Sequence, residues 1–232
     1  MGDDLLRDRV VLVTGASRGI GAATARRCAA AGARVVRNAR SEMPTLDGAI
    51  DVRADLADPV TRDDALQRIS TTVGVPDVVV NNAGAFLLAD LADTSDALAR
   101  EQLAINVEAP LAVARHFLPA MRARGAGTHI VIGSVADWRA FPGNAAYAAS
   151  KYAVRGLHEV LVEEFRGSGV RCTLISPGPT DTSVWDPHDP DRRQDLPDRS
   201  SMLRPDDVAE AVIFAATRPA RMQIELIRLG AT

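Results

Sequence analysis

A tyrosine and a lysine stand four residues apart in the stretch NAAYAASKYA, residues 144–153. On a helix these positions, Tyr147 and Lys151, lie on one face, with Cβ atoms roughly 5–6 Å apart. A free tyrosine titrates at about pH 10, whereas a general acid or base works best with a pKa nearer the working pH. A neighbouring ammonium group favours the phenolate. We therefore expect Tyr147 to exchange a proton with a substrate and Lys151 to lower its pKa; the alternative is a solvated surface pair.

Two further polar residues stand where they can serve the same chemistry. Ser134 ends a predicted strand, at the edge where open α/β sheets bind ligands, and its hydroxyl can stabilise charge on a reacting oxygen. Asn106 precedes Pro110 by four residues, and because proline has no N–H, the Asn106 carbonyl lacks its helical partner and can hold a water. Alternatively, Pro110 begins a new helical segment, since proline also favours the first helical turn.

A glycine-rich turn, TGASRGIG at 14–21, follows one apolar strand and opens a helix. Its glycines at 15, 19 and 21 allow a tight turn and let backbone N–H groups approach a pyrophosphate, which the helix N-terminus also attracts. In this context the turn indicates a dinucleotide site, although an ordinary strand–helix turn is the alternative.

The elements that must position these residues alternate between β-branched runs and helical patterns. Several runs are continuously apolar, as expected for strands covered on both faces. Strands are predicted at 9–14, 33–38, 49–53, 77–82, 128–134, 169–176 and 222–228, and helices at 19–31, 58–72, 94–124, 145–167 and 205–217. This order predicts an α/β fold: a Rossmann-like, doubly wound parallel sheet of about seven strands with helices on both faces, in a single domain over 1–232.

The segment 179–204 interrupts the alternation of strands and helices, because it is rich in proline and aspartate and only weakly periodic. A loop of this length inside a compact domain is typical of a lid, a binding loop or disorder. We interpret it as a substrate lid that is poorly ordered without ligands.

Composition excludes several classes of function. The net charge is -3 with no basic block, so nucleic acid is not an expected partner. No apolar run approaches the roughly 18 residues of a membrane span, and the four histidines lack metal-ligand spacing, so neither a membrane nor a metal is expected. The two cysteines, Cys28 and Cys172, form no CxxC pair and fit a reducing cytosol, which predicts a cytoplasmic protein.

The glycine spacing Gly-x-x-x-Gly-x-Gly resembles that of the short-chain dehydrogenase/reductase family, and further motifs in register carry the resemblance along most of the chain: ADL (54–56), NNAG (81–84) and SPGPTDT (176–182). The resemblance implies four catalytic residues, Asn106, Ser134, Tyr147 and Lys151. It also implies that a cofactor is bound by Gly15, Ser17, Arg18, Gly19, Ile20, Gly21, Arg40, Asp55, Leu56, Asn82, Ala83, Gly84, Tyr147, Lys151, Pro177, Gly178, Thr180 and Thr182.

The activity implied by the resemblance is hydride transfer between NADP(H) and a ketone or secondary alcohol. NADP(H) is expected because Ala39 stands where NAD-dependent members carry an aspartate, and because Arg40 and Arg18 can reach a 2′-phosphate. Two alternatives stay open, a non-catalytic NADP-binding scaffold and an NAD-dependent alcohol dehydrogenase. A cofactor-free dehalogenase is disfavoured by the intact glycine turn and by Lys151.

The substrate side is less defined by sequence. Trp138, Phe141 and Trp185 lie in loops that would surround a nicotinamide, so they are candidate pocket residues for an apolar or ring-bearing carbonyl compound. The stretch GSVADW lacks the small residues common after the family's serine, which predicts a narrower pocket. The apolar helix containing APLAVARHFLPAMRARG predicts self-association to a dimer or tetramer.

Overall fold

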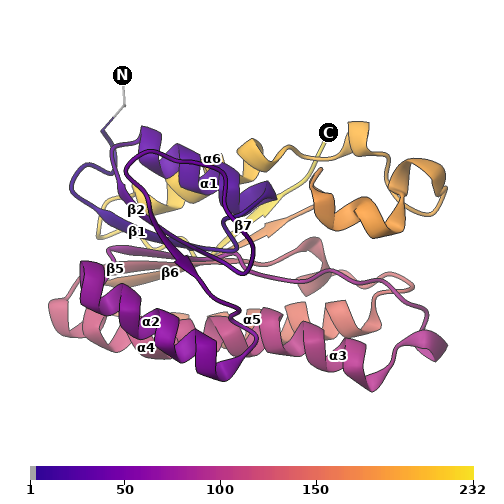
Figure 1. The fold of residues 1–232 in the computed structure, drawn as a ribbon, viewed down its shortest axis with the longest axis horizontal. Helices are drawn as coiled ribbons and strands as arrows, with labels where there is room; N and C mark the ends of the chain where they lie inside the picture. The colour runs from indigo at the N-terminus through magenta and orange to yellow at the C-terminus, as the bar shows by residue number, and fades with distance from the viewer. Residues whose placement is uncertain (1–3) are drawn as a thin grey trace.

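The computed structural model describes residues 4–232, in which strands and helices alternate along the chain (Figure 1). The strands are β1 (Val10–Thr14), β2 (Arg34–Ala39), β3 (Ile50–Arg53), β4 (Val78–Asn81), β5 (Gly127–Ile132), β6 (Val170–Pro177) and β7 (Leu226–Leu229). The helices are α1 (Gly19–Ala30), α2 (Pro59–Val73), α3 (Asp96–Leu103), α4 (Ala109–Arg124), α5 (Ala145–Glu164) and α6 (Pro205–Ala216).

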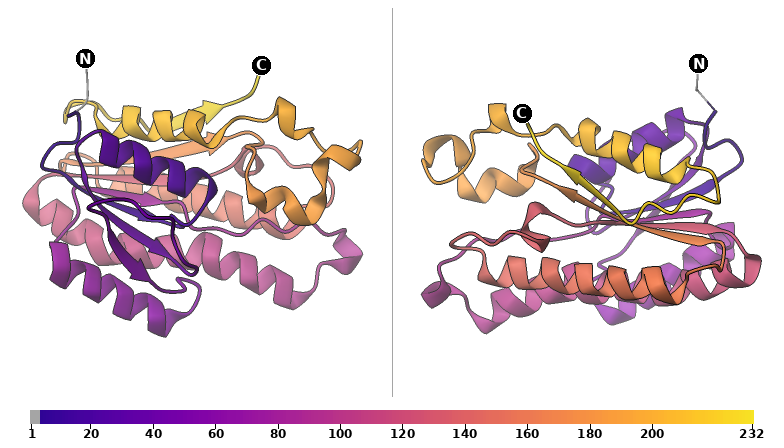
Figure 2. Two further views of the ribbon diagram at one scale, coloured as in Figure 1. Left: turned by 45° about the horizontal axis from the view of Figure 1, so that its top comes forward. Right: turned by 180° about the vertical axis from the view of Figure 1, so that it is seen from behind.

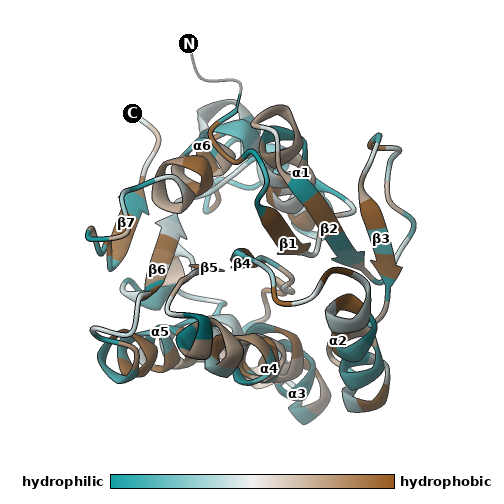
Figure 3. Cartoon of the chain, turned by 90° about the vertical axis from the view of Figure 1, so that its left-hand side faces the viewer, coloured by the Kyte–Doolittle hydropathy of each residue, from teal (hydrophilic) through white to brown (hydrophobic). Residues whose placement is uncertain are grey.

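The strands form one 7-stranded parallel sheet in the order β3-β2-β1-β4-β5-β6-β7. Helices α1 and α6 cover one face, and α2, α4 and α5 cover the other (Figure 3). The strand order reverses between β1 and β4, and a ligand crevice forms at such a switch point, beyond the carboxyl ends of the strands. The predicted doubly wound α/β fold is confirmed.

The central strands are apolar on both faces because each face meets a layer of helices. In β1, Leu12 belongs to the core under α2 and α4, whereas Val11 and Val13 belong to the core under α1 and α6. All three side chains are fully buried. The continuously apolar runs in the sequence are therefore a direct consequence of the two-sided cover.

The helix predicted over 94–124 is interrupted. A π-helical turn at Ala104–Glu108 joins α3 to α4, and Pro110 stands in the first turn of α4. Pro110 therefore opens a new helical segment, which is the second of the two expectations. The first, an unpaired Asn106 carbonyl, stays a prediction. Single π turns inside helices are frequent at functional sites, and this one contains Asn106.

The segment between β6 and α6 is folded, and it lies beyond the carboxyl end of the sheet on the side of α1 and α6 (Figures 1 and 2). It contains 3-10 turns at Ser183–His188, Pro190–Arg192 and Arg199–Ser201. Arg199 connects them, because its guanidinium donates to Asp181 and Asp186 at 2.7 Å. The interpretation of 179–204 as a lid that orders with ligand stays a prediction.

Strand β7 begins at Leu226, later than the predicted residue 222. Residues before it run beside β6 without regular pairing, since Thr173 and Cys172 bond to Ile224 and Gln223 through side chains. Among residues 4–232 there is no helix with the length and hydropathy needed to cross a membrane.

Replacement of Phe117 by alanine should lower the free energy of unfolding by about 3–5 kcal/mol, because it empties a fully buried site between α4 and the sheet. Phe214→Ala on α6 is the matched control, since that ring is 47% exposed and should cost much less. Chemical denaturation of both variants measures the difference, and equal losses would contradict this description of the core.

Candidate active site

The loops after β1, β2, β3, β4, β5 and β6 line one cavity of about 910 Å³. One end is lined by the glycine-rich turn and Arg40, and the other by Tyr147, Phe141 and Trp185. A volume of this size accommodates a large ligand with a second, smaller one beside it.

The glycine-rich turn adopts a conformation that other residues resist. Gly15 has φ +65°, and a Cβ there would lie 2.7 Å from the Ala83 backbone. Gly21 packs against the turn itself, since its Cβ would meet the Gly15 oxygen at 2.2 Å, and it does not line the cavity. No side chain caps the N-terminus of α1 and its first turn carries no acidic residue, which leaves its N–H groups available for an anion.

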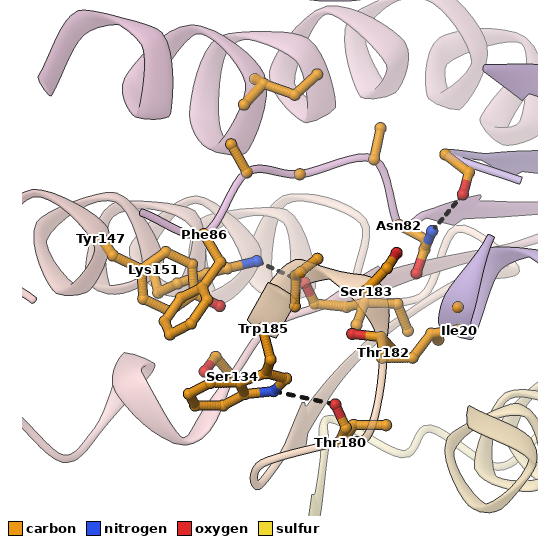
Figure 4. Close-up of a pocket in the computed structure, with 18 of the residues that line it drawn as sticks. Ile20, Asn82, Phe86, Ser134, Tyr147, Lys151, Thr180, Thr182, Ser183 and Trp185 are labelled. Atoms are coloured by element: carbon orange, nitrogen blue, oxygen red, sulfur yellow. Dashed lines mark hydrogen bonds between the residues drawn. The ribbon is translucent and has the colours of Figure 1, made fainter. Parts of the chain in front are cut away.

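Asn82 and Thr14 hold this turn against the end of β4. The Asn82 side chain donates to the carbonyls of Thr14 and Gly15 at 2.9 and 3.1 Å; Figure 4 shows one of these two bonds. In return, the Thr14 hydroxyl accepts the N–H groups of Asn82 and Ala83, both at 3.0 Å. Hydrogen bonds of the NNAG motif thus hold the glycine-rich turn in place beside the cavity. The sequence alone does not predict these bonds.

Charged side chains lie at the end of the cavity beyond β2. Arg40 is exposed, with 77% of its side chain accessible, and it lies 3.6 Å from the Asp55 carboxylate. Asp55 also accepts the Ala57 N–H at 2.9 Å, which fixes its orientation. Arg18 lines the same region, whereas Ala39 offers no charge. This end of the cavity therefore presents two arginines to a ligand.

Ser134, Tyr147 and Lys151 meet at the opposite end, from the loop after β5 and the first two turns of α5 (Figure 4). The Ser134 oxygen accepts the Ala136 N–H at 3.1 Å, so its own hydrogen is free to donate. Lys151 Nζ donates to the Ile132 carbonyl at 3.1 Å and lies 5.7 Å from the centre of the Tyr147 ring. Lys151 is also the only lysine in the chain.

Burial governs the ionisation of this pair. It raises the pKa of Tyr147 to about 12, an effect opposed by the Ser134 hydroxyl and reinforced by the charge of Asp137. It lowers the pKa of Lys151 to about 8, and the Asp137 charge opposes that shift. The expected lowering of the Tyr147 pKa is not found in this structure, because desolvation of the phenolate is the largest effect and the Lys151 ammonium bonds the Ile132 carbonyl instead.

Asn106 lies outside the cavity, fully buried behind it. Its side chain accepts from the Ala85 N–H and donates to the Ala85 carbonyl, both at 3.0 Å, and also donates to the Ser150 hydroxyl at 2.9 Å. These contacts fix the loop after β4 to α5, next to Lys151. The side chain of Asn106 thus fixes this loop in place, and the use of its main-chain carbonyl to hold a water stays a prediction.

An aromatic wall forms the substrate end. Phe86 packs edge-on against Tyr147 and Trp185, with ring centroids 4.8 Å apart in both pairs. Trp185 is buried, and its indole N–H donates to the Thr180 carbonyl at 3.1 Å (Figure 4). Phe141 also lines the cavity. The prediction for Trp138 is wrong: the 3-10 turn after Ser134 directs it away, and its ring stacks under Arg228.

The other predicted residues line the cavity as expected, namely Ser17, Gly19, Ile20, Leu56, Gly84, Pro177, Gly178, Thr180 and Thr182. Sequence reasoning missed the central place of Phe86 and the charged lining residues Arg139 and Arg193. Of the stretch GSVADW, Gly133, Ser134 and Val135 line the cavity, whereas Asp137 is buried and does not. The narrower pocket stays a prediction. The Ser-x-x-Asp spacing of a capping box was the signal for the place of Asp137.

The fold and the cavity define a doubly wound α/β protein with a dinucleotide-type cleft. Residues 9–193 match the family described as short chain dehydrogenase, so the chain belongs to the short-chain dehydrogenase family and is an oxidoreductase of that family. An uncharacterized oxidoreductase of Staphylococcus aureus strain USA300 is 30% identical over 231 residues, covering 96% of this chain and 97% of the relative.

Solved structures agree with this assignment. A gluconate 5-dehydrogenase from Burkholderia cenocepacia J2315, in complex with NADP and tartrate, is similar with a TM-score of 0.88 and 28% identity, covering 98% of this chain and 96% of that one. A metagenomic short-chain oxidoreductase in complex with NADP is similar with a TM-score of 0.82 and 31% identity, covering 99% of each chain.

The pKa of Lys151 can be measured directly, because a protein grown with isotope-labelled lysine contains one labelled side chain. Titration followed by NMR should give a midpoint near 8, since burial disfavours the ammonium. A midpoint at the ordinary value of about 10.4 would mean that the lysine is solvated and the site more open than described.

Proposed function

We propose that this protein is an NADP(H)-dependent oxidoreductase that transfers a hydride between the nicotinamide and a ketone or secondary alcohol, with Tyr147 as the general acid and base. The observation that carries the proposal is the continuity of one cavity. It joins an uncapped helix N-terminus and two arginines to a partly buried serine and tyrosine and a buried lysine.

The residues present fit NADP(H). The free N–H groups at the start of α1 suit the pyrophosphate, and Arg18 and Arg40 suit the 2′-phosphate. Lys151 stands where it can bond the ribose hydroxyls, and Pro177 and Gly178 line the space for the nicotinamide. When bound, this cofactor supplies or accepts the hydride. The NADP complexes of similar oxidoreductases support the same choice.

The chain's own residues then handle the proton. With a pKa near 12, Tyr147 is a neutral phenol at ordinary pH and can donate its proton to a carbonyl oxygen. Ser134 can donate a second hydrogen bond to that oxygen and stabilise its developing negative charge. In the reverse direction Tyr147 must lose its proton first, so a bound nicotinamide cation and protonated Lys151 would both assist alcohol oxidation.

The lining favours an apolar or ring-bearing substrate. Phe86, Phe141 and Trp185 form most of the wall beside Tyr147, and Val135 and Leu196 extend it. Arg139 and Arg193 also line the cavity, but Arg193 is paired with Asp195 at 2.5 Å. A screen in the direction of reduction should therefore contain both cyclic apolar ketones and keto acids, the oxidised forms of hydroxy acids such as gluconate, and we expect the former to be reduced faster.

Tyr147→Phe should reduce kcat by at least about 10²-fold while leaving the NADPH dissociation constant nearly unchanged, because only the proton donor is lost. Steady-state kinetics and fluorescence titration with NADPH measure the two quantities. Tyr152→Phe is the matched control, since Tyr152 is exposed on the same helix. The acid–base role would be refuted by a Tyr147→Phe enzyme that keeps more than about a tenth of the parent kcat.

Arg40→Ala should lower kcat/KM with NADPH by about tenfold and leave the value with NADH unchanged, because an exposed arginine contributes about 1–2 kcal/mol to binding a phosphate. Ala39→Asp should shift preference toward NADH by repelling the 2′-phosphate. Arg68→Ala on α2, outside the cavity, is the control. Equal values of kcat/KM for both cofactors in the parent enzyme would contradict the NADP assignment.

We also propose that the chain self-associates through the outer face of α4 and α5. Leu111, Tyr152 and Val160 are 44%, 46% and 59% exposed on these neighbouring helices. The helix α4 itself is not apolar all round, because Arg115 and Arg122 are exposed, so the proposal rests on this apolar face.

Light scattering should give the mass of a dimer or tetramer. Tyr152→Glu should lower this mass, whereas Val60→Glu on α2 should leave it unchanged. A monomer at micromolar concentration would contradict it.

A further inference from the structure

We propose that Arg199 is a positioning residue: its guanidinium holds residues 181–199 in the conformation in which Thr182 and Trp185 form part of the cavity wall. Arg199 itself lines no part of the cavity, so it acts there only through other residues of this segment. Its importance for substrate binding rests on the function proposed above, whereas the conformation of the segment is a property of the protein alone.

One guanidinium contacts three aspartates from different parts of the segment. Arg199 donates to Asp181 and to Asp186, both at 2.7 Å, and its Nε lies 3.8 Å from the Asp191 carboxylate. The main-chain N–H of Arg199 also donates to Asp191, at 2.8 Å. These partners stand 18, 13 and 8 residues before Arg199 in the chain. The one side chain thus joins the three 3-10 turns of the segment to one another.

Neighbouring arginines of the same segment make local pairs instead. Arg192 pairs with Asp189, three residues away, and 85% of its side chain is exposed. Arg193 pairs with Asp195, two residues away. Isolated exposed pairs of this kind contribute little, whereas several charges in a network contribute more. The Arg199 side chain is 26% exposed, so solvent screens its ion pairs less than it screens those of Arg192.

The two ends of the segment are joined at its base. The Leu203 N–H donates to the Pro179 carbonyl at 2.9 Å, and the Asp181 N–H donates to the Leu203 carbonyl at 2.8 Å. Thr180 and Leu203 form a parallel bridge. The main chain between them is therefore a closed loop beyond the carboxyl end of the sheet (Figures 1 and 2), and Arg199 provides the ties inside it.

Thr182 carries the effect of Arg199 to the glycine-rich turn. Its carbonyl accepts from the Arg199 guanidinium at 3.2 Å, and its side chain lies on the cavity wall. A Cβ on Gly19 would lie 3.0 Å from the Thr182 methyl, so the threonine packs directly against that turn. Arg199 thus holds the loop against the part of the site that would bind the cofactor.

Trp185 carries the same effect to the catalytic end. It directly precedes Asp186, one of the two aspartates that Arg199 bonds at 2.7 Å. Its buried ring packs against Phe86, and Phe86 packs against Tyr147 (Figure 4). The position of this aromatic wall therefore depends on a loop that Arg199 holds together.

Arg199→Met keeps much of the side-chain length and removes the charge. In hydrogen exchange followed by mass spectrometry, without cofactor or substrate, peptides within 181–199 should exchange about tenfold faster than in the parent, because charge-assisted bonds between the turns are lost. Arg192→Met is the matched control in the same segment and should leave exchange unchanged.

Two results would overturn the proposal. One is equal exchange in the parent and in Arg199→Met. The other is a parent segment that already exchanges as fast as an unfolded chain, which is the behaviour predicted from sequence for a lid that is poorly ordered without ligands.

Fluorescence of Trp185 tests whether charge is the cause. Trp138→Phe leaves Trp185 as the only tryptophan. In that background Arg199→Met should increase quenching by acrylamide, because the ring, 8% exposed, is no longer held against Phe86. Added NaCl should also increase quenching when Arg199 is present, since it screens the ion pairs, and should have no effect in Arg199→Met. Quenching that does not respond to NaCl with Arg199 present would show that packing alone holds the segment, and it would overturn the proposal.

Should Arg199→Met fail to fold, as judged by circular dichroism, the double variant Asp181→Asn, Asp186→Asn removes the two nearest charges from exposed side chains. It must give the same faster exchange, and an unchanged rate would overturn the proposal.

In the active enzyme, Arg199→Met should raise KM for a carbonyl substrate by about tenfold and change kcat less, because only molecules with the wall in place bind the substrate. Arg199→Lys should lie between the two, since lysine supplies a charge without the planar fork. A protein without activity on any carbonyl compound would refute the proposed function, yet hydrogen exchange would still decide the role of Arg199.

Discussion

The site depends on the burial of one lysine. Lys151 is enclosed between α5 and the end of β5, where its one hydrogen bond to residues 4–232 is with the Ile132 carbonyl. Arginine carries every other guanidinium or ammonium charge in the side chains of the sequence. Arginine stays charged under all ordinary conditions, whereas a buried lysine changes its pKa readily. At position 151, beside Tyr147, lysine rather than arginine therefore gives the site a cation whose pKa can change.

The surrounding structure supports that burial from several elements. The parallel sheet brings the loops after β1, β4, β5 and β6 to one edge, so residues distant in sequence enclose the same space. Asn82 and Thr14 brace the glycine turn, Asn106 fixes the loop after β4 to α5, and Phe86 packs against both Tyr147 and Trp185. Each contact preserves the low-dielectric surroundings that set the two pKa values.

Sequence patterns predicted the fold and most of the cavity, because the two-sided burial of β1 and β4 and the glycine turn are local signals. They failed where the outcome depended on distant contacts. Trp138 was placed in the pocket, but a short turn directs it toward Arg228 on β7. Asp137 reads as an ordinary loop residue until Ser176, on another strand, is seen to bond it. The direction of the Tyr147 shift required knowledge of its burial.

The central claim is that this cavity holds a reduced nicotinamide against a carbonyl carbon, with Tyr147 supplying the proton. Transfer of deuterium from specifically deuterated NADPH to the substrate tests it most directly, with the alcohol product analysed by mass spectrometry and NMR. One deuterium should appear on the carbinol carbon, on one face only, and the hydroxyl hydrogen should come from solvent. Binding of NADPH without deuterium transfer to any carbonyl compound would contradict the account and favour a non-catalytic scaffold.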